Sequence, residues 1–538
     1  MRGLINLYSD LENPNFSNKG TTKIQGKKES EQKKVVQKKP QNIQKKKESE
    51  QKNIVQKKPQ SLQKKKESQV VQKKPQNIQK KKENINNKKS PVKKNDINSE
   101  IYDPISFFGK YDDPLSILAP KKKPEDNDDI NIIPGKQDIK SKIDINFIEN
   151  IIDNLNDKKY KYKSIEELQN TLKAISEENN LSSEESKSFL VYCWVAKNLN
   201  YYIGNKPDNS PLGALQKRIT QCSGYARLFK ELLKVFNIKS ILVHGCGRTY
   251  SLNPKPKEEN HEWNAIKLNG EYYLCEVTWG SGKVENGKFI PSYNTYYFCC
   301  PPDQFIQTHL PSKDLEKWQL LSKKITKNDF DNLLYKDKFF YFYGFTNVSP
   351  NEGVVKLNNQ NVYEVKIENK NEIKGLRMSC KVFLEQSLIE NASCIEKFDN
   401  YFLVHLIFNK KGKYNVLFFT TDKSGTAHSD LILRQQFVTS SASKEIKSFP
   451  IMNTFPDDLH IIEPKYNNLP KNKVITFKFK SNDIEDMGIV INKKCSHLTK
   501  NDNIFEGSFT LGGEEILVGK FTADNPGNLK VMFKYNIK

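Results

Sequence analysis

Cys222 lies where the sequence predicts the start of a helix. Tyr225, Phe229, Leu232 and Phe236 follow it at helical spacing and form one apolar stripe. A thiol in the first turn of a helix lies beside unpaired backbone N–H groups and the positive end of the helix dipole, which favour the thiolate. Cys222 is therefore a candidate nucleophile. The alternative interpretation is a small cysteine that only packs in a core.

His261 and Glu276 lie on the two arms of a predicted β-hairpin. Asn269-Gly270 is a strong signal for a two-residue turn between these arms. Such a turn fixes the register, so Trp263 should face Glu276 and His261 should face Thr278. His261 and Glu276 then become diagonal neighbours on one face, with Cβ atoms about 7 Å apart or less and within reach of a hydrogen bond.

A thiolate, an imidazole and a carboxylate in this relation could carry out acyl transfer. The thiolate attacks an acyl carbon, the histidine acts as base and then as acid, and the carboxylate orients the imidazole. Each residue alone has a plainer interpretation, a packed strand histidine for His261 and a surface acid for Glu276. Taken together, the three residues make catalysis as strong an interpretation as packing.

Soft metal ligands also occur in this region, and they offer a competing interpretation. Cys275 should point to the face opposite His261, and no ligand pair has the C-x₂₋₄-C spacing of common zinc sites. No calcium-binding loop pattern occurs either. We therefore predict neither a metal nor a cofactor. The ligands considered are Cys222, His244, Cys246, His261 and Cys275.

Three motifs in order resemble the core domain of the transglutaminase-like superfamily. They are Cys222-Ser-Gly-Tyr, His261-Glu-Trp-Asn-Ala and Tyr273-Leu-Cys-Glu-Val-Thr-Trp-Gly280. More narrowly, they resemble the kyphoscoliosis peptidase-like family, and residues 192–201 and 296–321 are similar to further segments of that family. The resemblance covers residues 185–325 in detail. It implies an α+β core of the papain-like cysteine protease type.

By this resemblance, Cys222 is the nucleophile and His261 the base of a catalytic triad. Glu276 stands where the family carries Asp, which keeps the charge and adds a methylene group. Restoring Asp should then preserve or raise the activity of an enzyme. The backbone N–H of Cys222 is a natural oxyanion donor. Trp194 is a candidate second donor because animal transglutaminases use an indole N–H, although an ordinary core tryptophan is the plainer interpretation.

The basic charge of the chain is concentrated in one segment. Residues 23–94 contain 25 lysines and six glutamates, which supply +19 of the formal net charge of +23. Three near-copies of VVQKKPQNIQKKKES fill this segment, and it contains no aromatic residue. It cannot bury enough apolar surface to offset the entropy of ordering, so residues 1–96 are predicted to be a disordered Lys/Gln-rich tail.

The predicted tail has two open interpretations, a solvated linker or a binder of acidic partners such as cytoskeletal filaments. Its lack of aromatic residues argues against specific nucleic-acid binding. No stretch approaches the ~20 apolar residues of a membrane span. The nine cysteines form no CxxC pair and no signal-peptide core precedes them, so we predict a cytoplasmic protein with reduced thiols and an optional cytoskeletal association.

The rest of the chain divides by composition into an α+β core and strand-rich segments. Residues 97–136 are expected to be a linker or docking segment, and residues 137–325, which hold all four tryptophans, the transglutaminase-like core. Alternating apolar residues with frequent turn signals predict two β-sandwich modules, near residues 345–440 and 455–538.

These patterns predict a thiol-dependent enzyme that acts on the amides of protein substrates. It would either hydrolyse peptide bonds or cross-link Gln to Lys, and the 13 glutamines and 25 lysines of residues 23–94 could be its own substrate. The alternative is a catalytically lapsed scaffold that binds cytoskeletal or other acidic partners.

Overall fold

The computed structural model describes most of the chain beyond the basic segment. The predicted tail, residues 1–96, and most of the predicted linker, residues 97–136, lie outside the described residues. The described residues are 132–155, 160–205, 207–249, 259–285, 287–358, 361–372, 375–421, 429–452, 458–522 and 525–538.

Five helices precede the main sheet of the core. Three of them begin at serine N-caps: Ser164 accepts a hydrogen bond from Glu167 N–H, Ser183 from Ser186 N–H, and Ser210 from Gly213 N–H. The helices are α4 (Ile145–Leu155), α5 (Ile165–Glu178), α6 (Glu184–Asn198), α7 (Pro211–Lys217) and α8 (Cys222–Leu233). A short 3₁₀ turn, η2 (Ile139–Lys142), precedes them, and η4 (Lys234–Phe236) extends α8.

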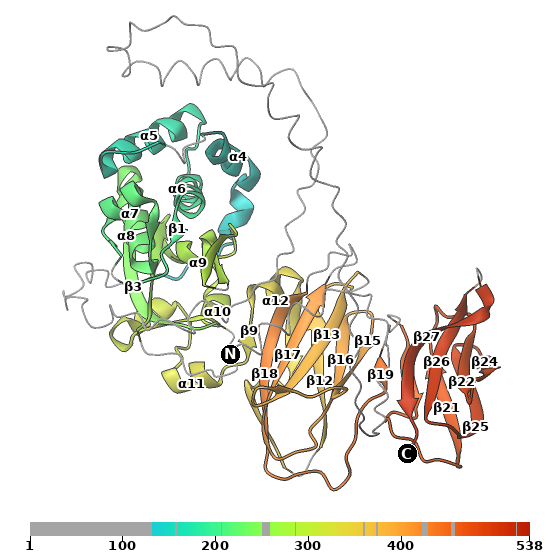
Figure 1. Ribbon diagram of the computed structural model, residues 1–538. Helices are drawn as coiled ribbons and strands as arrows, with labels where there is room; N and C mark the ends of the chain where they lie inside the picture. Colours follow the sequence, from blue (N-terminus) through green and yellow to red (C-terminus); the bar gives the residue numbers. More distant parts are fainter. Residues whose placement is uncertain are drawn as a thin grey trace, which may run out of the picture. The chain divides into compact units, whose positions relative to one another are not determined.

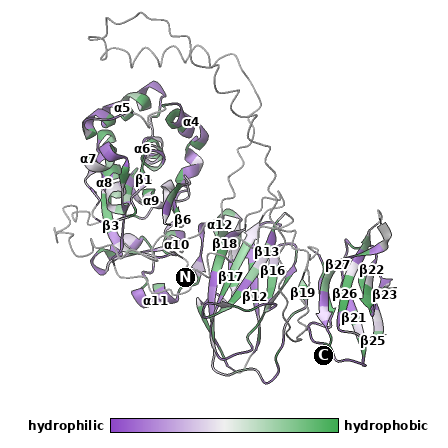
Figure 2. Ribbon diagram, viewed as in Figure 1, coloured by the Kyte–Doolittle hydropathy of each residue, from purple (hydrophilic) through white to green (hydrophobic). Residues whose placement is uncertain are grey.

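Helix α6 lies at the centre of this helical layer, and α4, α5 and α8 pack against it (Figure 1). Residues 188–196 are all buried, so this helix is enclosed on every side. The surrounding helices α4 and α5 carry both hydrophobic and hydrophilic residues (Figure 2), as expected for amphipathic helices with one solvated face.

Helix α4 carries two apolar stripes at helical spacing, one formed by Phe147, Ile151 and Leu155 and the other by Ile148 and Ile152. Ile148 and Ile152 are buried, whereas Phe147 is exposed. Both stripes have helical spacing, and only packing against α6 decides between two apolar faces that differ by one residue.

The core sheet has four antiparallel strands in the order β5-β4-β3-β8. Strands β4 (His261–Leu268) and β5 (Glu271–Cys275) form the predicted hairpin around Asn269-Gly270. Strand β3 (Ser240–Gly247) lies between β4 and β8 (His309–Pro311). The mixed helix and strand content confirms the predicted α+β class.

Shorter elements complete the core. Strands β1 (Asn200–Tyr201) and β2 (Ile219–Thr220) pair in parallel, and β6 (Gly282–Glu285) pairs with β7 (Lys288–Pro291). Helix α9 (Val277–Ser281) follows β5, and α10 (Pro302–Phe305) precedes β8. The 3₁₀ turn η5 (Lys313–Gln319), α11 (Lys327–Asn332), β9 (Tyr335–Lys336) and α12 (Lys338–Phe342) lead into the strand-rich region.

The next segment forms two sheets whose apolar residues share one buried cluster, as in a β-sandwich. One sheet holds β10 (Phe345–Ser349), β12 (Val362–Asn369), β16 (Tyr401–Ile407) and β15 (Ser393–Lys397). The other holds β11 (Val354–Leu357), β18 (Asp430–Thr439), β17 (Gly412–Thr421), β13 (Arg377–Leu384) and β14 (Ser387–Leu388), with β9 paired to β18.

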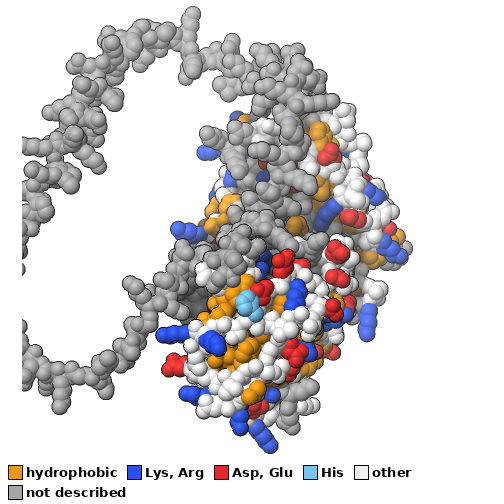
Figure 3. Space-filling view, turned by 90° about the vertical axis from the view of Figure 1, so that its right-hand side faces the viewer, with side chains coloured by type: hydrophobic (Ala, Val, Ile, Leu, Met, Phe, Trp, Pro, Cys, Tyr) orange, Lys and Arg blue, Asp and Glu red, His pale blue; other side chains and the backbone are white. Residues whose placement is uncertain are grey.

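The last segment repeats this arrangement around a separate buried cluster. One sheet contains β19 (Ile451–Met452), β27 (Asn525–Asn536), β26 (Glu515–Thr522), β22 (Met487–Ile491) and β23 (Lys494–His497). The other contains β20 (His460–Glu463), β21 (Val474–Lys480), β25 (Ile504–Thr510) and β24 (Thr499–Asn501). On the face that Figure 3 shows, acidic and basic side chains are interspersed, without a large patch of one sign.

None of the helices in the described part of the chain is both long and apolar enough to cross a membrane.

Candidate functional site

Cys222 is the first residue of α8, as the sequence predicted. The N-cap residue, Gln221, makes no side-chain capping bond, and its Nε2 instead donates to the carbonyl oxygen of Gly204 at 3.1 Å. The first-turn N–H groups of α8 therefore lack a side-chain acceptor from the cap, although Gly224 N–H donates to the carbonyl oxygen of Gln221 at 2.9 Å. Cys222 itself is only 4% exposed.

Two polar contacts fix α8 against strand β4. The buried side chain of Asn264 donates from Nδ2 to the carbonyl oxygen of Ala226 at 3.0 Å. Arg227 forms an ion pair with Glu262, with 3.2 Å between Nε and Oε1. These contacts hold the helix that carries Cys222 against the strand that begins with His261, so that Cys222 lies near enough to His261 to raise the pKa of its imidazole.

His261 and Glu276 form the hydrogen bond that the predicted register allowed. Nε2 of His261 lies 2.7 Å from Oε2 of Glu276, and both side chains are fully buried. The pairing runs from Leu268–Glu271 to Asn264–Cys275, as a two-residue turn requires. The expected pairs of Trp263 with Glu276 and of His261 with Thr278 are wrong, because the strand ends at Cys275, Glu276 is the N-cap of α9 and Thr278 lies in that helix.

Glu276 uses its two carboxylate oxygens for different purposes. Oε1 accepts backbone hydrogen bonds from Thr278 N–H at 2.6 Å and Trp279 N–H at 3.1 Å, so Glu276 is the N-cap of α9. Oε2 is left to face His261. The extra methylene of Glu relative to Asp is thus accommodated by a side chain that folds back onto its own helix.

The electrostatic environment favours a charged imidazole. Complete burial by itself lowers the pKa of His261, but the charge of Glu276, together with Cys222, raises this pKa to about 10. His261 therefore keeps its proton at neutral pH. A protonated imidazole beside a cysteine is the partner that a thiolate requires.

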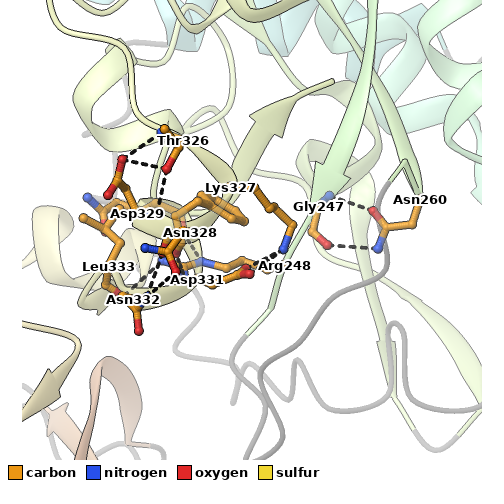
Figure 4. A network of polar contacts seen from close by, with 12 residues as sticks. Gly247, Arg248, Asn260, Thr326, Lys327, Asn328, Asp329, Asp331, Asn332 and Leu333 are labelled. Carbon is orange, nitrogen blue, oxygen red and sulfur yellow. Dashed lines mark hydrogen bonds and ion pairs between the residues drawn. The ribbon is translucent and has the colours of Figure 1, made fainter. Parts of the chain in front are cut away.

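The end of β3 is held beside His261 by the network in Figure 4. Oδ1 of Asn260 accepts from Gly247 N–H at 2.7 Å, and Nδ2 of Asn260 donates to Gly247 O at 3.1 Å. The next residue, Arg248, is buried and donates to the carbonyl oxygens of Phe330 and Leu333. The backbone next to His261 is thus fixed from both sides.

Replacing Asn260 by Asp should destabilise the core by about 1–3 kcal/mol. The change keeps the acceptor for Gly247 N–H but places a carboxylate oxygen against Gly247 O, where an amide now donates. Tryptophan fluorescence during urea unfolding reports the core, because all four tryptophans lie there. The same change at the exposed Asn332 in α11 is the control, with an expected effect below about 0.5 kcal/mol. Equal effects at both positions would contradict the prediction.

A second histidine lies at the site, and sequence reasoning did not assign it a role. His309 is fully buried, and its Nε2 is 3.7 Å from Oε2 of Glu276. Its ring centroid is 5.3 Å from that of His261 and 4.5 Å from that of Trp279. In the sequence, the only signal for a role of His309 was its place in a segment similar to the kyphoscoliosis peptidase-like family. Local patterns could not place it beside the hairpin, because its strand lies more than thirty residues further along the chain.

Trp194 lies within the helical layer. Its ring stands 6.0 Å from the ring of Tyr162 and 4.4 Å from the guanidinium of Arg218, and the residue is fully buried. The indoles with ring contacts to His261 are those of Trp263, at 6.2 Å, and Trp279, at 5.6 Å. The role of Trp194 as an oxyanion donor stays a prediction.

Most of the soft ligands considered from the sequence do not meet. In the strand pairing, His244, Cys246 and Cys275 alternate with the residues on the His261 face and so lie on the opposite one. Within the described ranges, the three-donor group that could hold a metal is His261, Glu276 and His309, with ligand atoms within 4.8 Å of one another. A metal there would have to displace the proton that the raised pKa keeps on His261.

The comparisons with known proteins cover the same region. Residues 173–277 match the transglutaminase-like superfamily, and this range contains Cys222, His261 and Glu276. Kyphoscoliosis peptidase of Mus musculus is 29% identical over 179 residues, which cover 31% of this chain and 27% of that protein. The resemblance to the superfamily and to the kyphoscoliosis peptidase family is thereby confirmed.

Two invertebrate proteins are similar over the same part of the chain. Hillarin of Drosophila melanogaster is 25% identical over 193 residues, covering 32% of this chain and 23% of hillarin. The Lim and transglutaminase domain protein ltd-1 of Caenorhabditis elegans is 24% identical over 174 residues, covering 29% of this chain and 24% of that protein. The matches span about a quarter of the length of these curated relatives.

Proposed function

We propose that this chain, whose residues 173–277 form a transglutaminase-like domain related to that of kyphoscoliosis peptidase, is a thiol-dependent acyl-transfer enzyme that acts on protein amides. The observation that carries the proposal is the buried His261–Glu276 hydrogen bond, with 2.7 Å between Nε2 and Oε2, beside a thiol at the start of α8 that acts on the pKa of His261. Cys222 is the nucleophile, His261 the acid and base, and Glu276 the group that orients the imidazole.

The reaction begins when the sulfur of Cys222 attacks the carbonyl carbon of an amide. A thioester forms as the C–N bond breaks, and His261 gives its proton to the departing nitrogen. If the amide is a Gln side chain, the leaving group is ammonia, and a Lys amine can then displace the thiol to form an isopeptide bond. If the amide is a peptide bond, water completes the hydrolysis. In both cases His261 removes a proton from the incoming nucleophile.

The first turn of α8 supports the stabilisation of the tetrahedral intermediate. Cys222 begins the helix, and its N-cap side chain does not occupy the first-turn N–H groups. A negative oxygen formed next to Cys222 would meet these donors and the positive end of the helix dipole. Trp194 remains the proposed second donor.

Different parts of the chain would bind protein substrates and acidic partners. The triad would act on protein amides, whereas the Lys-rich residues 23–94 would attract acidic surfaces such as those of cytoskeletal filaments. We propose a cytoplasmic, cytoskeleton-associated location on this basis. The two strand-rich segments would serve as binding or spacing modules.

Purified full-length protein should incorporate a fluorescent primary amine into its own glutamines under reducing conditions and form a ladder of cross-linked species on denaturing gels. The Cys222→Ala variant should show neither, because it has no nucleophile. Deletion of residues 23–94 tests whether the tail is the acyl donor, and a peptide library tests hydrolysis in parallel. A wild-type chain that neither cross-links nor cleaves in any of these assays would refute the proposal.

Burial favours a second function, that of a non-catalytic scaffold. Cys222 is 4% exposed and the side chains of His261 and Glu276 are completely buried, so a substrate must displace part of the structure to reach them. In a scaffold, the hydrogen-bonded residues would only stabilise the domain. Cys222→Ala would then leave the binding of partners unchanged.

A further inference from the structure

We propose that His309 is a positioning residue of this site, a neutral imidazole whose Nε2–H is directed at Oε2 of Glu276 and holds that oxygen against His261. The inference rests on the proposed function for its catalytic meaning, but its geometry and its test do not depend on turnover. It assigns a role to a histidine that lies outside the Cys–His–acid arrangement.

The sheet brings His309 to the site in an unusual way. His261 is on β4 and His309 is on β8, and β3 lies between these strands. Side chains two strands apart are normally separated by about 10 Å. The two imidazole centroids are nevertheless only 5.3 Å apart. Both rings must therefore lean across the intervening strand.

Two glycines of β3 make this approach possible. Gly245 pairs with His261 and Gly247 pairs with His309, so these four positions share one face of the sheet. A Cβ at Gly247 would lie 3.1 Å from Cβ of His261, and one at Gly245 would lie 2.2 Å from the carbonyl oxygen of Leu310. Side chains at these two positions would occupy the space above β3.

The neighbouring Thr308 hydroxyl fits either tautomer of His309, because it can also donate to the carbonyl oxygen of Phe305 at 3.4 Å, so the Glu276 carboxylate decides between them. Oγ1 of Thr308 lies 2.8 Å from Nδ1 of His309. If Nδ1 accepts from this hydroxyl, the ring proton is on Nε2 and faces the Glu276 oxygen at 3.7 Å. In the other tautomer a lone pair on Nε2 would face the lone pairs of a buried carboxylate, which is repulsive. The Nε2–H tautomer is therefore the one that this site favours.

His309 is also kept neutral. Complete burial, together with the positive charge of His261, lowers the pKa of His309 well below its ordinary value. Aromatic rings enclose it, with Phe305 stacked at a centroid distance of 4.4 Å and Trp279 at 4.5 Å. A neutral imidazole can donate to Glu276 without competing with His261 for the positive charge.

Three hydrogen bonds and one longer contact, the 3.7 Å between His309 Nε2 and Oε2, together define the position of Glu276. Oε1 is fixed by two backbone N–H groups of α9, and Oε2 lies between the two imidazoles. A Glu side chain has one more rotatable bond than Asp, so it needs an additional restraint to hold a carboxylate as firmly. His309 supplies this restraint on the oxygen that contacts His261.

The test compares His309→Phe, which keeps an aromatic ring but removes the donor, with His309→Gln, whose amide can still donate. Two readouts require no substrate: the rate of Cys222 alkylation at pH 7, and the far-downfield proton NMR signal of the His261 N–H bonded to Glu276. We expect His309→Phe to slow alkylation about three- to tenfold and to broaden or remove the signal. His309→Gln should restore at least half of the loss.

Two further variants separate positioning from packing. Thr308→Val removes the hydroxyl that contacts Nδ1 of His309 and should change both readouts in the same direction as His309→Phe, to a smaller extent. His244→Phe, the same exchange on the opposite face of the sheet, should leave both unchanged. In a Glu276→Gln background, His309→Phe should have no additional effect on alkylation.

The inference is wrong if His309→Phe leaves the signal and the alkylation rate at wild-type values, or if its effect is the same with and without the Glu276 carboxylate. A wild-type chain that gives the expected signals but no acyl transfer would instead refute the proposed function and leave the role of His309 intact.

Discussion

In a His261→Ala variant, alkylation of Cys222 by iodoacetamide at pH 7 should slow by about tenfold, and turnover should fall by roughly 10²- to 10⁴-fold. A thiolate paired with an imidazolium is ionised at neutral pH, whereas only about 3% of an ordinary thiol is ionised there. A stabilised thiolate is intrinsically less nucleophilic, which offsets part of this difference in ionised fraction. The expected slowing of alkylation is therefore only about tenfold. Turnover additionally loses its acid and base.

The raised pKa of His261 determines how the rate of Cys222 alkylation should depend on pH. The raised pKa of His261, about 10, means that the imidazolium persists from neutral pH up to about pH 10. Wild-type alkylation should therefore be fast and nearly constant across this range, whereas the variant should accelerate only towards about pH 8.5, where ordinary thiols ionise. The stability contributed by His261 is fully present below its unfolded pKa of about 6.5 and is lost as the pH rises through 10.

Other cysteines serve as internal controls in the same peptide mass spectrometry experiment. Cys495 is exposed and serves as the reference for a thiol that the reagent can reach. Burial raises the pKa of Cys300 to about 12, so this thiol should stay unreactive in the folded protein. A Cys222 that reacts no faster than Cys495 at pH 7, with or without His261, would contradict the ion pair and favour the scaffold.

Replacing Glu276 by Gln should lower turnover by roughly 10³- to 10⁴-fold, the loss seen when a triad acid becomes an amide. Gln can keep the two hydrogen bonds from Thr278 and Trp279 N–H, so α9 retains its cap. Its NH₂ group then faces Nε2 of His261, which must accept instead of donate. The ring proton is forced onto the other nitrogen, and the imidazole can no longer take a proton from Cys222.

Glu276→Asp separates the geometry of this carboxylate from its charge. The sequence suggested that Asp would preserve or raise activity, but the structure changes this expectation. Because Oε1 caps α9 while Oε2 contacts His261, a side chain shorter by one methylene cannot keep both contacts without moving the backbone. We expect turnover about tenfold below wild type and a lower thermal midpoint. Activity at or above the wild-type level would contradict the division of roles between the two oxygens.

A matched control for both exchanges is Glu271→Gln, at the other end of the same hairpin. This glutamate accepts a hydrogen bond from the Tyr273 hydroxyl at 2.7 Å, well away from the triad along the strand. Its exchange should leave turnover within about a factor of two, because the transition state contains no contact with it. A comparable loss there would indicate general damage to the hairpin.

Local signals in the sequence were sufficient to predict where Cys222, His261 and Glu276 lie. An apolar helical stripe placed Cys222 at a helix start, and a two-residue turn brought His261 and Glu276 together, because such patterns act over a few residues and a tight turn fixes the register. The end of the strand at Cys275 was not predictable in this way, because Glu276 and Thr278 could equally continue a strand. Hydrogen bonding between Glu276 and the backbone of α9 decided it.

The sequence by itself thus determined the basic character of residues 23–94, and it placed Cys222 at a helix start and His261 beside Glu276, the three residues for which we propose catalytic roles. Only the tertiary structure decided which face of α4 is buried, that Trp194 packs against Arg218, and that His309 reaches Glu276. The physical reason is sequence separation. Strand β8 joins the sheet through β3, and the rings of His261 and His309 meet only because Gly245 and Gly247 leave the space above β3 open.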